Sequence, residues 1–61
     1  MEKNLDDMLD QLHSLTKGMD VPSHMRRKPK WLVSKMGKRN SDHPNFEEAL
    51  SLAKELVSAG L

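Results

Sequence analysis

The sequence predicts an all-α fold, a small three-helix domain with helices over about residues 4–17, 29–36 and 45–59. The first and third segments carry apolar residues at helical spacing, with polar residues between them. Residues that favour helix ends flank the segments, and nowhere do apolar and polar residues alternate as they do in a strand. Residues 1–61 are therefore expected to form one small helical domain.

The first helix is predicted over residues 4–17. Its apolar residues share an arc of about 120° at about 100° per residue, and they are Leu5, Met8, Leu9, Leu12 and Leu15. Asn4 is the candidate N-cap, and the acids Asp6 and Asp7 suit the first turn. Gly18 follows as the candidate C-terminal signal, because glycine adopts the left-handed conformation that often ends a helix.

Residues 19–28 show no helical period and are expected to form a connector with one short turn that begins at Ser23. Pro29 suits the first position of the second helix, over 29–36, because that position does not use its backbone N–H. Gly37 is the candidate end of this helix.

The third helix, over residues 45–59, has the broadest apolar face. The face covers an arc of about 160° and comprises Phe46, Ala49, Leu50, Leu52, Ala53, Leu56 and Val57. Asn45 and Glu48 resemble a capping box, and Gly60 follows the last turn. This helix is expected to pack antiparallel to the first helix, with Leu12 and Leu50 in the core. Its face either extends to a second chain or is flanked on both sides within the monomer.

The net charge of +1 conceals three blocks of unlike charge. Residues 1–25 and 42–61 each sum to −3, whereas residues 26–41 sum to +7 and contain no acid. Trp31 lies in the basic block and is predicted to project within about 40° of Lys35 and Lys38 on a helical wheel. The candidate partner-binding residues are therefore Arg26, Arg27, Lys28, Lys30, Trp31, Lys35, Lys38 and Arg39.

Two chemistries suit a tryptophan among cations. Tryptophan and arginine are enriched at the centres of protein interfaces, and an indole can also stack on a nucleobase while cations contact phosphates. Two structural roles compete with these: Trp31 can turn inward against the core, and the basic residues can pair with the acidic face of the first helix.

No catalytic, cofactor or metal site is predicted. The chain has no cysteine, and its three histidines are too widely spaced to suggest zinc ligands. The three glycines are isolated, so no phosphate-binding loop is expected. A chain this short is also expected to lack room for a pocket of about 300 Å³ or more beside its core. The protein is therefore not expected to be an enzyme or to use a small-molecule substrate.

The longest apolar run, residues 31–33, is too short to span a membrane. The N-terminus passes from Met1 directly to charged residues without an apolar signal region. The sequence therefore predicts a cytoplasmic or intracellular protein, acting in a host cell if it is viral, with no membrane partner.

The favoured function is a non-catalytic protein-interaction module, an accessory or regulatory factor that binds a larger protein or self-associates. The methionines suggest an adaptable surface, except for Met1, which is uninformative, and Met8, which is expected in the core. The alternative is a nucleic-acid-binding protein that places residues 26–39 on phosphates. The acidic flanks weaken attraction to nucleic acid, and Glu47, Glu48 and Glu55 on the third helix would repel phosphate in a helix-turn-helix arrangement.

Overall fold

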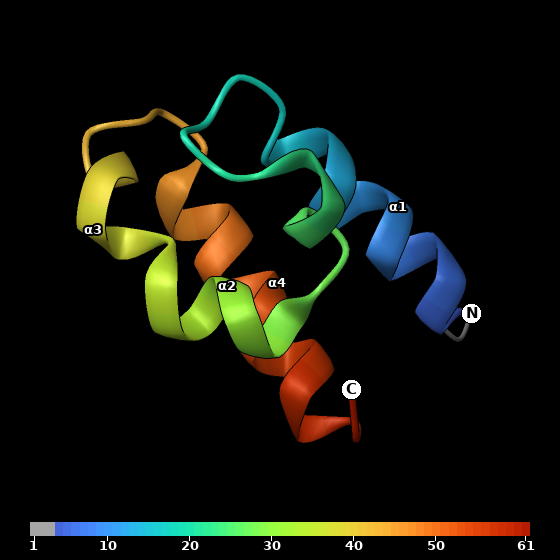
Figure 1. Ribbon diagram of the computed structural model, residues 1–61. Coiled ribbons are helices and arrows are strands. Elements are labelled where there is room, and N and C mark those ends of the chain that lie inside the picture. Colours follow the sequence, from blue (N-terminus) through green and yellow to red (C-terminus); the bar gives the residue numbers. More distant parts are fainter. Residues whose placement is uncertain (1–3) are drawn as a thin grey trace.

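The computed structural model describes residues 4–61 and is all-α, as predicted (Figure 1). No strand occurs among these residues. The chain forms α1 (Leu5–Leu15), a 3-10 turn η1 (Ser23–Met25), α2 (Pro29–Lys35), α3 (Gly37–Asn40) and α4 (Phe46–Ser58). The three predicted helices correspond to α1, α2 and α4, and the short helix α3 was not predicted.

The first helix, α1, begins at the predicted place. The Asn4 side chain accepts a hydrogen bond of 2.7 Å from the Asp6 N–H, which makes it the N-cap. The helix ends earlier than predicted, at Leu15, and the N–H of its C-cap Thr16 donates to the Leu12 carbonyl. Gly18 then adopts φ +85°, the left-handed conformation expected of it.

The second helix begins at Pro29 and the preceding 3-10 turn at Ser23, both as predicted. The second helix, α2, ends at Lys35, one residue before the predicted end, but Gly37 lacks the positive φ of a left-handed helix end and instead begins α3. Met36 keeps helical backbone angles, φ −60° and ψ −37°, and the chain continues as α3. A Cβ at Gly37 would lie 3.4 Å from the Phe46 ring, an ordinary contact, so the approach of Phe46 to the start of α3 does not depend on a glycine there.

The last helix, α4, starts without the predicted capping box. Asn45 makes no side-chain cap bond, and its own N–H donates to Nδ1 of His43 at 3.1 Å. The predicted C-terminal signal is confirmed, because Gly60 has φ +102°. The N–H groups of Gly60 and Leu61 bond the carbonyls of Val57 and Leu56, which is the pattern of a Schellman motif.

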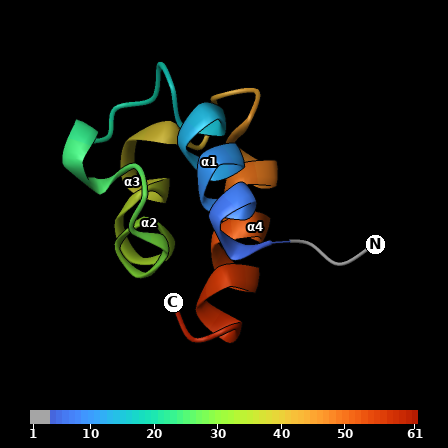
Figure 2. The same cartoon turned by 90° about the vertical axis from the view of Figure 1, so that its right-hand side faces the viewer.

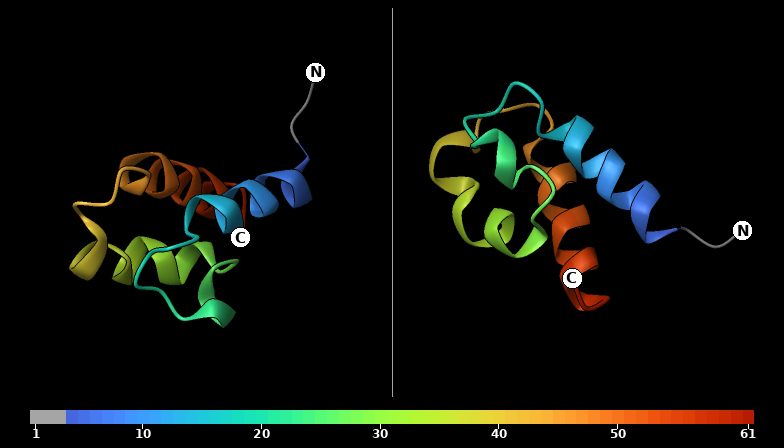
Figure 3. Two further views of the ribbon diagram at one scale, coloured as in Figure 1. Left: turned by 90° about the horizontal axis from the view of Figure 1, so that it is seen from above. Right: turned by 45° about the vertical axis from the view of Figure 1, so that its right-hand side comes forward.

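The helices surround one core with α4 at its centre, packed against both α1 and α2. In Figures 1 and 2, α1 and α4 run in opposite directions. Seen from above in Figure 3, α2, α3 and η1 form a second layer on one side of that pair. The buried apolar residues are Met8, Leu12, Met19, Leu32, Met36, Ala49, Leu52, Ala53 and Leu56. Met8 thus lies in the core as predicted, and Met19 and Met36 also fill the core instead of forming an adaptable surface.

The broad apolar face of α4 is flanked on both sides within the monomer. Its central residues Leu52 and Leu56 are buried, and Leu50 and Val57 at its margins are half-buried. At the C-terminus, Leu61 is 38% exposed. Among the described residues, α4 therefore leaves no uncovered stripe that calls for a second chain.

Candidate functional site

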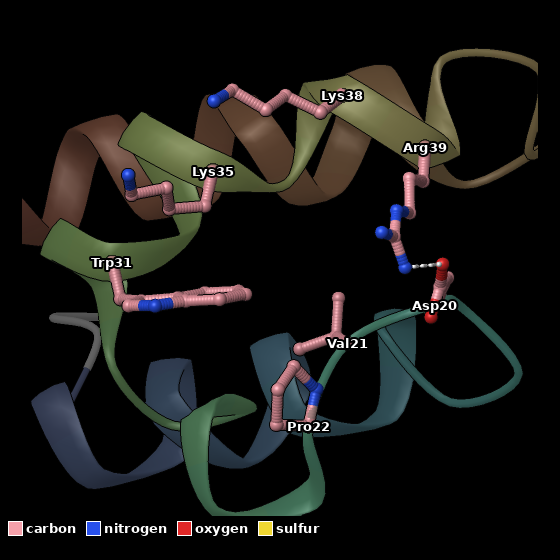
Figure 4. A pocket seen from close by; sticks show the side chains of 7 residues that line it. All are labelled: Asp20, Val21, Pro22, Trp31, Lys35, Lys38 and Arg39. Carbon is pink, nitrogen blue, oxygen red and sulfur yellow. Dashed lines mark hydrogen bonds and ion pairs between the residues drawn. The ribbon is translucent and has the colours of Figure 1, made fainter.

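A hollow of about 390 Å³ lies between the α2–α3 path and the connector that follows α1 (Figure 4). Its lining residues are Asp20, Val21, Pro22, Trp31, Lys35, Lys38 and Arg39. The expectation that so short a chain lacks room for such a hollow is wrong. The hollow opens on the surface between two segments, so it takes no volume from the core.

Trp31 forms the apolar side of the hollow. Figure 4 shows its indole extending from α2 beneath Lys35, with Val21 and Pro22 facing it from the connector. The indole is half-buried and packs against the edge of the core. Part of the ring therefore serves folding, and the rest borders the hollow.

The connector is held in place by Asn40, whose side chain is almost completely buried. Its Oδ1 accepts a hydrogen bond from the Asp20 N–H at 2.6 Å, and its Nδ2 donates to the carbonyls of Asp20 and Met36 at 3.3 and 2.8 Å. Beside it, Arg39 pairs with the Asp20 carboxylate at 3.1 Å. The hydrogen bonds of Asn40 fix the wall opposite Trp31. The sequence pattern places Asn40 in a non-helical segment between two predicted helices. Its contact with Asp20 could not be predicted, because the two residues are 20 positions apart.

The arginines of the basic block mainly contact the protein itself. Arg26 donates to the His13 carbonyl at 2.6 Å and to the Thr16 hydroxyl at 3.4 Å, so it satisfies groups at the C-terminal end of α1. Arg27 pairs with Asp10 on the exposed face of α1. Arg27 therefore plays the structural role that the sequence offered as an alternative, in which a basic residue pairs with the acidic face of the first helix.

The lysines divide into two groups. Lys35 and Lys38 line the hollow, whereas Lys28 and Lys30 are exposed and lie outside its lining. Within residues 4–61, none of these four lysines forms an ion pair. The hollow thus has three basic side chains and one carboxylate, a net charge of +2.

The structure brings half of the predicted site residues to the hollow. These are Trp31, Lys35, Lys38 and Arg39. The other half lie elsewhere: Arg26 and Arg27 bind α1, and Lys28 and Lys30 face solvent. Sequence reasoning missed Asp20, Val21 and Pro22, which carry no binding motif and are brought to the site by long-range contacts such as those of Asn40 with Asp20.

The chain has no match among protein-family models, curated proteins or solved structures. In the part of the chain that the structure describes, no group of three or more histidine, aspartate or glutamate side chains is placed to hold a metal ion. None of the described helices is both long and apolar enough to cross a membrane. The geometry of the hollow is therefore the feature that bears on function.

Proposed function

We propose that the protein is a non-catalytic interaction module, an accessory or regulatory factor that binds a larger protein through this hollow. The observation that carries the proposal is the half-buried Trp31 beside an open hollow whose two walls are held by side-chain contacts. Tryptophan anchors contribute strongly to protein binding when they contact a partner's side chain in a pre-formed pocket. A wall that is already ordered also lowers the entropy that binding must remove.

The side chains at the hollow support binding over catalysis. Its lining contains no histidine, serine or threonine, and its single carboxylate, on Asp20, is paired with Arg39. General acid–base and nucleophilic catalysis need a reactive group held beside a proton donor or acceptor. The described lining offers cations and apolar surface instead.

Protein is favoured over nucleic acid as the partner because the arginines are engaged. Arginine recognises phosphate through two parallel hydrogen bonds, but Arg26 already donates to part-buried groups at the end of α1, and Arg27, in an exposed pair with Asp10, lies outside the hollow. Lys28 and Lys30 lie outside the lining of the hollow that contains Trp31. The basic block therefore does not present one continuous row of unengaged cations around the indole.

Site-specific photo-crosslinking in the native host tests the proposal. The probe p-benzoylphenylalanine replaces Lys38 at the hollow, and the matched control carries it in place of Ser51, an exposed residue of α4. We expect a nuclease-resistant adduct with one larger protein from position 38 and none from position 51. The adduct should disappear when Lys35→Glu is added, while the circular dichroism spectrum is unchanged.

Four results would contradict the proposal. An adduct that nuclease removes would favour the nucleic-acid alternative. Equal adducts from positions 38 and 51 would mean that the hollow is not the contact surface. The absence of any protein adduct from position 38, and also from the same probe at Pro22, which leaves both lysines of the hollow in place, would exclude partner binding there. An adduct between two copies of the chain would mean that the hollow binds a second copy of this protein and not a larger partner.

A further inference from the structure

We infer that the hollow binds an acidic, extended peptide segment of the partner, with one apolar side chain inserted against Trp31 and carboxylates beside Lys35 and Lys38. This inference rests on the proposed function and adds the chemistry of the ligand. It follows from the size of the hollow, the composition of its lining and its charge.

The size of the hollow favours a peptide segment over a folded surface. A volume of about 390 Å³ is near the lower end of the range of about 300–1,000 Å³ that ligand sites occupy. It can hold one or two side chains, whereas a folded partner would need a broad and continuous contact area. The hollow is also open to the surface between the connector and α2–α3 (Figure 4).

The apolar part of the lining requires an apolar group from the ligand. Trp31 and Val21 are half-buried and Pro22 is exposed, and all three face the same space. These side chains retain contact with water in the unbound protein. An aliphatic or aromatic side chain placed among them would remove that surface from water, which is favourable.

The charged part of the lining favours acids beside that group, on the α2–α3 side of the hollow. Lys35 and Lys38 extend along the α2–α3 side of the hollow in Figure 4, and neither forms an ion pair among residues 4–61. Long lysine side chains can cover apolar surface with their stems while the ammonium groups remain available to a ligand. Lys28 and Lys30 add to the positive field that attracts an acidic chain from a distance.

Asp20 occupies part of the site with a charge like that of the expected ligand. Its carboxylate pairs with Arg39, and both side chains are well exposed, at 59% and 76%. An exposed pair of this kind contributes little to stability. A carboxylate of the bound peptide can therefore compete with Asp20 for Arg39. Removing the charge of Asp20 should strengthen binding, and unfolding could not produce that effect.

The test begins with an unbiased selection of peptides. A displayed library of random dodecapeptides is selected on the immobilised protein, and recovered peptides are synthesised and titrated. Trp31 is the single tryptophan of a chain without tyrosine, so its fluorescence reports directly on the hollow. We expect the selected peptides to carry net negative charge and one apolar residue in common, and their binding to shift the emission of Trp31 to shorter wavelength.

Charge variants give the matched comparison. We expect Lys35→Glu to weaken binding of the selected peptide about tenfold or more, and Lys30→Glu, the same change outside the hollow, to weaken it less than about threefold. Asp20→Asn should tighten binding about threefold. Both backbone contacts between Asp20 and Asn40 are preserved in Asp20→Asn, so the fold should be unchanged.

Selection of basic or uncharged peptides, or of none, would overturn the inference. Equal losses of peptide affinity in Lys30→Glu and Lys35→Glu, or weaker peptide binding by Asp20→Asn, would also overturn it. The same holds if a single-stranded oligothymidylate binds more strongly than any peptide and its binding depends on Lys35. The two proposals fail separately. If position 38 forms its protein adduct but acidic peptides do not bind, the inference is wrong and the proposed function stands. If acidic peptides bind but no protein adduct forms, the proposed function is wrong.

Discussion

At the residue scale, the side chain of Asn40 joins two segments that are 20 positions apart in the sequence. Its amide accepts one hydrogen bond from the backbone of Asp20 and donates two others, to the carbonyls of Asp20 and Met36. Few side chains other than an amide can accept and donate in this way from a single buried position. Asn40 therefore determines where the connector lies relative to α2 and α3.

We predict that Asn40→Ala lowers the free energy of unfolding by about 1–3 kcal/mol, because it leaves buried backbone groups without partners. Asn40→Asp should be at least as harmful, since its second carboxylate oxygen would face the two carbonyls that now accept from Nδ2. Urea unfolding followed by circular dichroism measures both variants. Ser41→Ala, at the exposed next residue, is the control and should change stability by less than about 0.5 kcal/mol. If Asn40→Ala unfolds at the same urea concentration as this control, the contacts of Asn40 are not important for stability.

At the scale of the elements, two glycines with the same sequence signature have different roles. Gly18 adopts φ +85° after α1, where an L-residue with a Cβ is strained. Gly37 lies at the start of α3 without a positive φ, close to the Phe46 ring. One glycine is required by its backbone conformation, whereas the other occurs within an almost continuous helical path.

Alanine at the two positions should therefore have opposite effects. Gly18→Ala is expected to destabilise the protein by about 1–2 kcal/mol, because the residue must keep its left-handed conformation. Gly37→Ala is expected to stabilise it by about 0.5–1 kcal/mol, because alanine favours helix and the nearest Phe46 atom would be at 3.4 Å, an ordinary contact. Melting temperatures measured by circular dichroism compare the two variants. A loss of stability in Gly37→Ala would mean that Phe46 cannot move to accept the methyl group.

At the scale of the whole molecule, the core depends on a few large side chains from three helices. Leu12 of α1, Leu32 of α2 and Leu56 of α4 are each completely buried. Leu50, which the sequence also predicted as core, is only half-buried at the margin of α4. The helices are short, so their stability comes mainly from this shared packing and not from helix propensity.

We predict that Leu12→Ala costs about 2–5 kcal/mol, enough to unfold much of so small a protein. Leu50→Ala should cost less than half as much, because less of its side chain leaves water on folding. Urea titration of both variants at one protein concentration measures the difference. Equal losses would show that Leu50 is as deeply packed as Leu12, contrary to the structure.

The covered face of α4 also leads to a prediction about self-association. Among the described residues, the large apolar side chains classed as exposed are Leu5 and Leu61, at 40% and 38%. Since neither belongs to an uncovered stripe, we expect a melting temperature that does not change over a hundredfold range of protein concentration. A melting temperature that rises with concentration would show that folding is linked to association with a second copy.

Features that depend on near neighbours in the chain could be predicted from the amino-acid pattern alone. Helical period predicted α1 and α4, and Asn4, Pro29 and Gly60 marked helix ends because their effects act within a few residues. The charge blocks also identified the region that contains Trp31, Lys35, Lys38 and Arg39, half of the predicted site.

Which charged side chains of the basic block are available to a partner depends on tertiary contacts that the sequence pattern does not predict. Arg26 and Arg27 find their contacts on α1, and Asn40 finds Asp20, through segments that no local pattern relates. The same packing covers α4 and opens the hollow beside Trp31. Composition and spacing specify which groups a segment carries, but whether a side chain binds its own protein or remains free depends on the distances that folding creates.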